Sequence, residues 1–493
     1  MNTPAKKIAV IVTHGMGEQI PMATIDGFVD AAWVINNDAH WPPPADENAD
    51  DIWFMPDSLA GLRELRRVTT RWTRSIADPN GKGPRVDFFE FYWADLAEGT
   101  TVQEVWDWLR TLLVRWPSQV PKGVMGAWLL LWAVTAVIAI LAVLALVPWA
   151  HAWWHAGFGA AAAFVAYVMQ YIVSPYAGDV ARYVRADPRN IAIRANIRDR
   201  GLKLLQDIHA KGDYQRIIFV AHSLGTIVAY DLICLLWAER SKASTMSENA
   251  PAFAKLRAVE TAAHALAAAP QADFPARQRA YREAQRELRL ALRSGGKDGT
   301  EPPRQPEDEW LISDFVTLGS PLTHAQFLLA RDAADLETKI DRQLFPTNWP
   351  QFELVQSEQR QKIYDRPTPP PDGIEGPAGG LFSYFIRPPQ TWAMHDAAPF
   401  AAVRWTNIFD SHRCIFHGDI ISGPLAGVFG QGIRDIDLKD LRGQSKVFSH
   451  TLYWSIFGDR AKANTLPHIV ALNKAIDLLD RPDRDIWSLS GPV

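Results

Sequence analysis

The chain has very few cysteines and no basic excess. Of its 493 residues only Cys234 and Cys414 are cysteines, and the formal net charge is −4. Two cysteines cannot build a disulfide framework, and no Cys/His cluster has zinc-ligand spacing. We therefore expect both cysteines to be reduced and buried, as suits a reducing compartment. The charge balance gives no sign of the basic surface by which proteins bind nucleic acid.

The N-terminus also lacks the features of a signal peptide. Its first apolar run, residues 8–12, is too short for one and is soon interrupted by His14-Gly15. The run is rich in β-branched residues and ends in a glycine turn, which predicts a buried strand over residues 8–13.

One long stretch, residues 124–149, contains no charged residue. At 1.5 Å per residue it is long enough to cross about 30 Å of hydrocarbon. A second uncharged stretch, residues 157–173, is shorter, and the link between the two carries tryptophans where interfacial aromatic residues are expected. We predict a transmembrane helical hairpin over residues 121–175. The alternative is a buried helical hairpin inside a soluble protein.

Basic residues flank this hairpin on both sides, whereas its link has none. Arg115 and Lys122 precede it, and Arg182, Arg185 and Arg189 follow it. By the positive-inside rule both flanks face the cytoplasm. We therefore expect a protein of the cytoplasmic membrane, with the rest of the chain on the cytoplasmic side.

The remaining segments are predicted from their periodicity and composition. Strands are expected at residues 85–92, 216–220, 314–318 and 403–409, and helices at 22–34, 191–211, 225–237 and 464–479. Residues 36–84, rich in Pro, Asp and Asn, are expected to be irregular. An insert of about residues 240–305 should hold one or two solvated helices within residues 251–294. A Pro- and Gly-rich segment of about residues 344–400 is a candidate lid.

The chemistry is carried by the motif Ala221-His-Ser-Leu-Gly225. An apolar β-like run precedes it and an apolar helix follows, which is the strand–turn–helix setting of a nucleophile elbow. Small residues two positions either side of Ser223 keep the sharp turn free of collisions, although Ala221 replaces the more usual glycine. The start of the helix behind Ser223 also favours negative charge. We predict that Ser223 is a nucleophile.

A glycine-containing loop follows the first strand, with the sequence Thr13-His-Gly-Met-Gly17. Such a loop can turn backbone N–H groups toward one point, and an oxyanion needs two such donors. We predict the N–H groups of Met16 and Leu224 for this role and a structural role for the His14 side chain. The alternative, a phosphate-binding loop, lacks the Gly-Lys-Ser/Thr ending.

A general base is expected late in the chain, because the residues that accompany a nucleophile elbow follow in the order Ser, acid, His. His450, in Phe448-Ser-His-Thr-Leu-Tyr-Trp454, is the predicted base. His468 is the rival, but it follows Pro467 at an expected helix start.

The acid must lie between the nucleophile and the base, and two aspartates qualify. Asp410 ends a predicted strand and Asp419 lies on the loop after it. A triad acid usually occupies such a loop, where it orients the imidazole, so Asp419 is favoured over Asp410. His412 and His417 lie near Asp419 and raise the alternative of a metal site. We predict no metal and no cofactor.

Several motifs together resemble those of lipase-like α/β-hydrolases, and the likeness is greatest to bacterial members that carry a membrane hairpin. They are Ala-His-Ser-Leu-Gly, the early His-Gly-Met-Gly, Thr317-Leu-Gly-Ser-Pro321, Asp419-Ile-Ile-Ser-Gly-Pro-Leu425 and Ser-His-Thr-Leu-Tyr-Trp. The resemblance covers about half the chain. It implies an α/β-hydrolase fold with a mostly parallel sheet flanked by helices, split into residues 1–120 and 176–493. It also implies Ser223, Asp419 and His450 as a triad, and a place in the bacterial inner membrane.

The expected function is therefore hydrolysis of carboxylic esters through an acyl-enzyme on Ser223. The membrane hairpin favours lipid or other lipophilic acyl esters as substrates. Three alternatives stay open: an acyltransferase that uses the same serine, a non-catalytic membrane scaffold, and an antibacterial lipase toxin. Acyl length, head group and oligomeric state are not encoded in any pattern we recognise.

Overall fold

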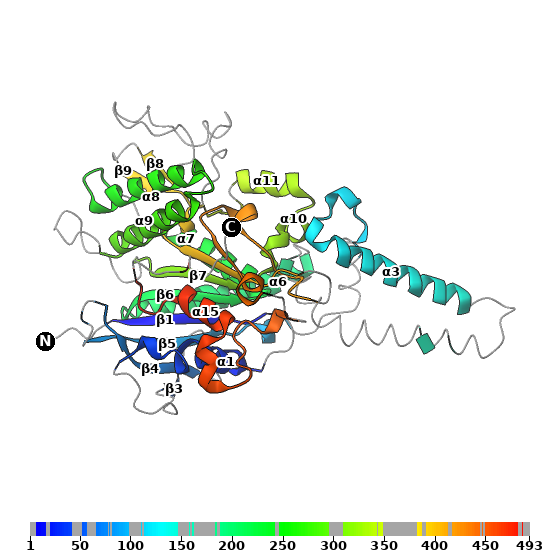
Figure 1. Ribbon diagram of the computed structural model, residues 1–493. Coiled ribbons are helices and arrows are strands. Elements are labelled where there is room, and N and C mark those ends of the chain that lie inside the picture. The colour runs from blue at the N-terminus through cyan, green and yellow to red at the C-terminus, as the bar shows by residue number, and fades with distance from the viewer. Residues whose placement is uncertain are drawn as a thin grey trace.

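A sheet with helices on both faces forms the centre of the protein (Figure 1). Among the described residues it has nine strands, in the order β11-β10-β7-β6-β1-β5-β4-β2, with β3 paired to β4. The computed structural model describes residues 6–15, 20–41, 52–56, 66–76, 78, 81–97, 110, 113–145, 157, 160–161, 183–184, 188–241, 246–294, 309–342, 344–348, 382–386, 391–412, 417–443, 446, 449–481 and 486.

Six neighbouring strands of the described sheet are parallel, so their carboxyl ends share one edge, here called the carboxyl edge. The protein is thus mixed α/β with a mostly parallel sheet, as expected from the sequence. In spatial order the parallel strands are β5 (Lys82–Phe91), β1 (Lys7–Thr13), β6 (Tyr214–His222), β7 (Ile312–Leu318), β10 (Arg404–Phe409) and β11 (Arg434–Asp437).

An antiparallel border extends the sheet beyond β5 and overturns the prediction that residues 36–84 are irregular. It consists of β4 (Arg66–Arg74), β3 (Ile52–Pro56) and β2 (His40–Trp41). The Pro, Asp and Asn content of this region hid β4, whose nine residues include three threonines, a valine and a tryptophan. The prediction gave too much weight to composition averaged over fifty residues.

The two faces of the sheet are covered by different helices, and β1 illustrates how its alternating side chains serve both. Ala9 and Ile11 join one core, whereas Ile8, Val10 and Val12 join the other. The first core includes α6 (Pro188–Ala210), α7 (Gly225–Arg240), α8 (Pro251–Ala267) and α9 (Phe274–Ser294). The second includes α1 (Ala23–Val29) with the π-helical turn η1 (Asp30–Val34), α14 (Leu438–Arg442) and α15 (Pro467–Ile476).

The predicted insert does form two helices, α8 and α9, but α9 is not simply solvated. Its Arg282 donates to the carbonyl oxygen of Trp405 at 2.6 Å, and its Gln285 donates to that of Phe400 at 2.5 Å. The described ends of the predicted lid segment include the hairpin of β8 (Ser383–Ile386) and β9 (Thr391–Met394), and the middle of that segment lies outside the described residues.

A long apolar helix, α3 (Lys122–Ala145), projects away from the body of the protein (Figure 1). Among the described residues it is the one helix long and apolar enough to cross a membrane. Its first turns join a small core, where Val124, Met125 and Trp128 lie near Phe327 of α10 (Ala325–Leu328). Most of the second predicted membrane helix, residues 157–173, lies outside the described residues.

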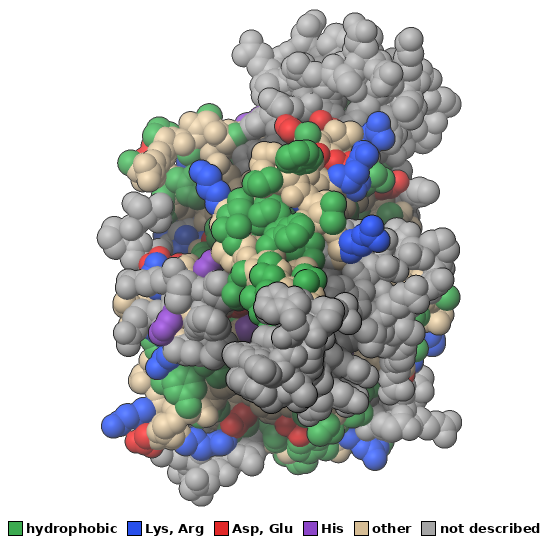
Figure 2. All heavy atoms as spheres, turned by 90° about the vertical axis from the view of Figure 1, so that its right-hand side faces the viewer, with side chains coloured by type: hydrophobic (Ala, Val, Ile, Leu, Met, Phe, Trp, Pro, Cys, Tyr) green, Lys and Arg blue, Asp and Glu red, His purple; other side chains and the backbone are tan. Residues whose placement is uncertain are grey.

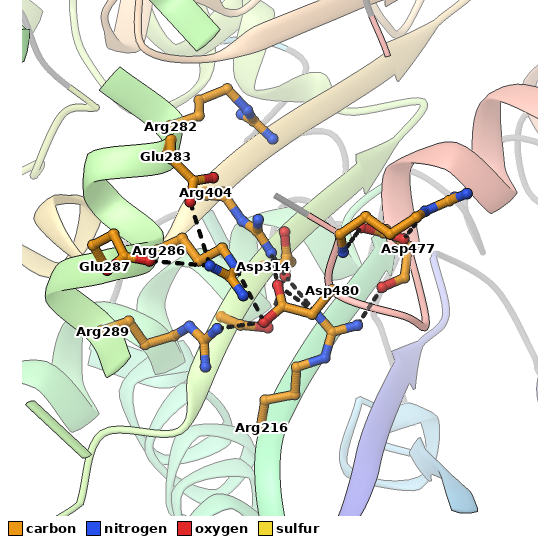
Figure 3. Close-up of polar contacts among 12 residues, drawn as sticks. Arg216, Arg282, Glu283, Arg286, Glu287, Arg289, Asp314, Arg404, Asp477 and Asp480 are labelled. Atoms are coloured by element: carbon orange, nitrogen blue, oxygen red, sulfur yellow. Dashed lines mark hydrogen bonds and ion pairs between the residues drawn. The ribbon is translucent and has the colours of Figure 1, made fainter. Parts of the chain in front are cut away.

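At the opposite, amino edge of the parallel strands, arginines surround two aspartates (Figure 3). Asp480 lies 3.1 Å from Arg216, 2.8 Å from Arg289 and 2.7 Å from Arg404, and Arg404 also lies 2.8 Å from Asp314. The three arginine side chains are at most 4% exposed. This cluster ties α9 and the segment after α15 to the sheet.

Candidate active site

Ser223 lies at the carboxyl edge, on the turn between β6 and α7. Its φ of +52° belongs to the left-handed region that side chains rarely adopt, as expected of a strained nucleophile elbow. Its N–H donates to the carbonyl oxygen of Leu318 at 3.0 Å, which fixes the turn against β7. Gly225 has no room for a side chain, because an added Cβ would collide with the carbonyl oxygen of His14. The close approach of the loop after β1 therefore requires a glycine at position 225.

The two predicted partners of Ser223 lie beside it. Its Oγ is 2.8 Å from Nε2 of His450, and Nδ1 of His450 is 2.8 Å from Oδ2 of Asp419. An ionised Asp419 can only accept, so Nδ1 carries the proton and Nε2 is free to accept the Ser223 hydroxyl proton. The fold thus brings together Ser223 and His450, which are 227 positions apart in the chain. With Asp419 they have the geometry of a nucleophile, a base and an orienting acid.

Asp419 is 1% exposed, yet its environment favours the carboxylate. Its Oδ1 accepts from the N–H of Ile421 at 3.0 Å, and its Oδ2 accepts from His450 and from the hydroxyl of Tyr453. Burial alone would raise the pKa of Asp419, but the hydrogen bond and charge interaction with His450 and the hydrogen bonds from Tyr453 and Ser422 outweigh it and lower the pKa to about 2. The acid therefore stays charged throughout the physiological pH range.

The rival acid and the rival base lie elsewhere. The carboxylate of Asp410 is 2.5 Å from the guanidinium of Arg442. The Nε2 of His468 bonds the carbonyl oxygen of Ser455 at 2.9 Å, and its ring stacks on Phe457. Both residues support neighbouring loops, and the geometry selects Asp419 and His450 from the alternatives that the sequence left open.

The loop after β1 passes directly over the nucleophile. A Cβ added to Gly15 would lie 2.6 Å from Cβ of Ser223, so only glycine allows this approach. His14 shapes the loop: its Nε2 accepts from the N–H of Trp93 at 3.3 Å, so its Nδ1 donates to the carbonyl oxygen of Gly15 at 2.9 Å. Burial lowers the pKa of His14 to about 4 and keeps the ring neutral. Met16, the first predicted oxyanion donor, lies outside the described residues.

Leu224, the second predicted oxyanion donor, follows Ser223 at the N-cap of α7 and is fully buried. N–H groups at the start of a helix have no partner within the helix, and the helix dipole makes this end positive. An oxyanion formed next to Ser223 would therefore meet a favourable field.

Three further residues belong to the site, although the sequence analysis assigned them no function: His222, Gly319 and Tyr453. The Nε2 of His222 donates to the carbonyl oxygen of His450 at 2.7 Å, and burial together with the neighbouring His450 lowers the pKa of His222 to about 3. Gly319 has a φ of +60°, and a Cβ there would lie 2.7 Å from the ring of Tyr453. All three lie in motifs quoted from the sequence: His222 precedes Ser223, Gly319 follows β7 and Tyr453 is three residues after His450. These positions were the signal by which the sequence could have pointed to them.

No group of three or more His, Cys, Asp or Glu side chains within the described part of the chain is arranged to hold a metal ion. In particular, the Nε2 of His412 bonds the carbonyl oxygen of Gly123 at 3.1 Å. Comparison of the chain with models of protein families, with curated proteins and with solved structures gave no match.

Proposed function

We propose that the protein is a serine hydrolase with an α/β-hydrolase fold that cleaves carboxylic esters. The observation that carries the proposal is the hydrogen-bonded series Ser223, His450 and Asp419 on a strained turn at the carboxyl edge. The ends of parallel strands at such an edge are the usual place for ligand sites in α/β sheets.

The geometry accounts for both halves of an ester hydrolysis. As the Oγ of Ser223 attacks the ester carbonyl, Nε2 of His450 takes its proton and Asp419 stabilises the resulting imidazolium. The N–H of Leu224 and that of Met16 are proposed to bind the oxyanion. His450 then returns the proton to the leaving alcohol, and a water molecule activated by the same imidazole releases the acid.

We further propose that the substrate is a lipid or another lipophilic acyl ester, and that α3 anchors the protein in a membrane. The 24 residues of α3 span about 36 Å, enough for a hydrocarbon core. Its base lies near the site. The carbonyl oxygen of Gly123 accepts from Nε2 of His412, and an added Cβ at Gly123 would lie 3.5 Å from His324 of the η9 turn (Pro321–His324). The Nε2 of His324 in turn donates to the carbonyl oxygen of Ile420, the residue after Asp419. Figure 2 looks at the face from which α3 projects, where hydrophobic side chains gather with histidines beside them.

Labelling with a fluorophosphonate probe tests the hydrolase proposal. Full-length wild-type protein should be labelled and should cleave a soluble p-nitrophenyl ester, whereas Ser223→Ala should do neither. Equal labelling of the two proteins would rule out Ser223 as the nucleophile. Alkaline carbonate extraction tests the anchor separately, because release of the full-length protein into the soluble fraction would exclude it.

A further inference from the structure

Tyr453 contacts the candidate acid through a hydrogen bond that the three-residue mechanism does not use. Its hydroxyl donates to Oδ2 of Asp419 at 2.6 Å, and this is the same oxygen that accepts from Nδ1 of His450. Tyr453 is 2% exposed. Its hydroxyl also lies 3.1 Å from that of Ser422, which can donate to the tyrosine oxygen, and the Ser422 side chain is a hydrogen-bond partner of Asp419 as well.

Local sequence and turn geometry place Tyr453 there. His450 and Tyr453 are three residues apart, and the chain between them bends through the 3₁₀ turn η12 (Ser449–Thr451). Tyr453 follows the end of this turn by two residues, and both side chains reach Oδ2 of Asp419. Gly319 packs closely against this group, because an added Cβ would lie 2.7 Å from the ring of Tyr453 and 3.1 Å from Oδ2 of Asp419.

We propose that Tyr453 is a positioning residue that holds Asp419 ionised and correctly rotated for His450. This inference rests on the proposed hydrolase function. A buried carboxylate needs several donors to stay charged and fixed. Tyr453 supplies one that is neutral, so it steadies Asp419 without adding a positive charge that would compete with the imidazolium of His450.

The protonation state of Tyr453 suits this role. Burial, the charge of Asp419 and the hydrogen bond between them all raise the pKa of Tyr453 well above its ordinary value. The hydroxyl therefore remains a donor at every pH at which an ester hydrolase works. Fixing the carboxylate limits its rotation about the Cβ–Cγ bond, which would otherwise turn Oδ2 away from Nδ1.

The test compares Tyr453→Phe with Tyr214→Phe in the full-length protein. Tyr214 is a matched control, because its buried hydroxyl also donates to a buried aspartate, Asp87, at 2.8 Å, but at the amino end of β6. With active sites counted by fluorophosphonate titration, Tyr453→Phe should lower kcat per site about 10- to 100-fold with little change in KM. Tyr214→Phe should retain the wild-type kcat per site.

Two further measurements keep the inference open to refutation. The far-downfield proton resonance of His450 Nδ1–H should shift or broaden in Tyr453→Phe, a change that a loss of folded protein alone would not produce. If Tyr453→Phe does not fold, Ser422→Ala should still lower kcat about two- to fivefold, because it removes the hydroxyl that contacts both Tyr453 and Asp419 and so loosens the hydrogen bonds that fix the carboxylate.

The inference is overturned if kcat per site in Tyr453→Phe stays within about twofold of wild type, or if the resonance is unchanged. It is overturned equally if Tyr453→Phe does not fold and Ser422→Ala behaves as wild type. Because the resonance requires no turnover, this failure is distinct from that of the hydrolase itself, which would appear as wild-type protein without labelling that depends on Ser223.

Discussion

The two edges of the parallel sheet bury carboxylates in opposite ways. At the carboxyl edge Asp419 is held by His450, Tyr453 and a backbone N–H, none of which carries a permanent charge. At the amino edge Asp480 is held by Arg216, Arg289 and Arg404 (Figure 3). Arginine stays protonated at all relevant pH values, whereas an imidazole exchanges its proton readily.

Because of this difference, the amino edge suits a structural role and the carboxyl edge suits proton transfer. Burial alone would raise the pKa of Asp480, but the three arginines outweigh it and hold that pKa far below its ordinary range. No proton can move in such a cluster, so it can only join parts of the fold. At the carboxyl edge the partner of the carboxylate can gain and lose a proton, which is what a general base requires.

The largest predicted effect is the loss of kcat in Asp419→Asn, which removes the carboxylate at the carboxyl edge. The side-chain amide can donate to Nδ1 of His450 and so favour the wrong imidazole tautomer, and kcat should fall by about 10⁴-fold. Steady-state hydrolysis of a soluble ester measures this, with circular dichroism to verify the fold. A fall of less than tenfold would show that Asp419 does not orient the base.

The counterpart at the amino edge is Asp480→Ala, which should affect stability and leave chemistry intact. Removing the carboxylate leaves three buried guanidiniums short of negative charge, so the free energy of unfolding should drop by about 3–5 kcal/mol. Urea unfolding measures the drop, and kcat per titrated Ser223 should be unchanged.

A surface ion pair provides the control for Asp480→Ala. The side chains of Asp459 and Lys462 are 59% and 80% exposed, and Asp459→Ala should cost less than about 1 kcal/mol. If Asp480→Ala costs no more than Asp459→Ala, then the amino-edge cluster does not stabilise the fold.

Glu90 adds a smaller effect on stability to the comparison, one that depends on pH. It lies near the end of β5 at the carboxyl edge, where its Oε2 accepts from the N–H of Met22 at 2.6 Å. Burial raises the pKa of Glu90 from 4.5 to about 7, so the folded protein keeps a proton that the unfolded chain releases between these values. Stability must therefore fall as pH rises through this window.

Glu90→Gln removes the titration and tests its sign. The variant should be more stable than wild type by about 1–3 kcal/mol at pH 8 and nearly equal to it at pH 4, below the pKa of the unfolded chain. Urea unfolding at the two pH values gives both differences. A variant less stable than wild type at pH 8 would contradict the proposed protonation of Glu90.

Elements with a strong local signal were predictable, and elements stabilised from a distance were not. β1, β6 and α7 follow from apolar runs and the small residues around Ser223. The polar stripe of α9 looked solvated, because the backbone carbonyls and carboxylates that receive Arg282, Gln285 and Arg289 lie more than a hundred positions away in the chain. The strand β4 was missed because it lies, together with β3, within a region of turn-forming composition, although its other partner β5 was predicted.

The sequence by itself determined the nucleophile turn, since a strand, a tight bend and a helix are set by neighbouring residues. It also limited the acid and the base to two candidates each. Only the tertiary structure decided between Asp419 and Asp410 and between His450 and His468, and only it joined Tyr453 to the acid. The reason is that the order of strands in the sheet, and not separation along the chain, fixes which distant loops meet at its carboxyl edge.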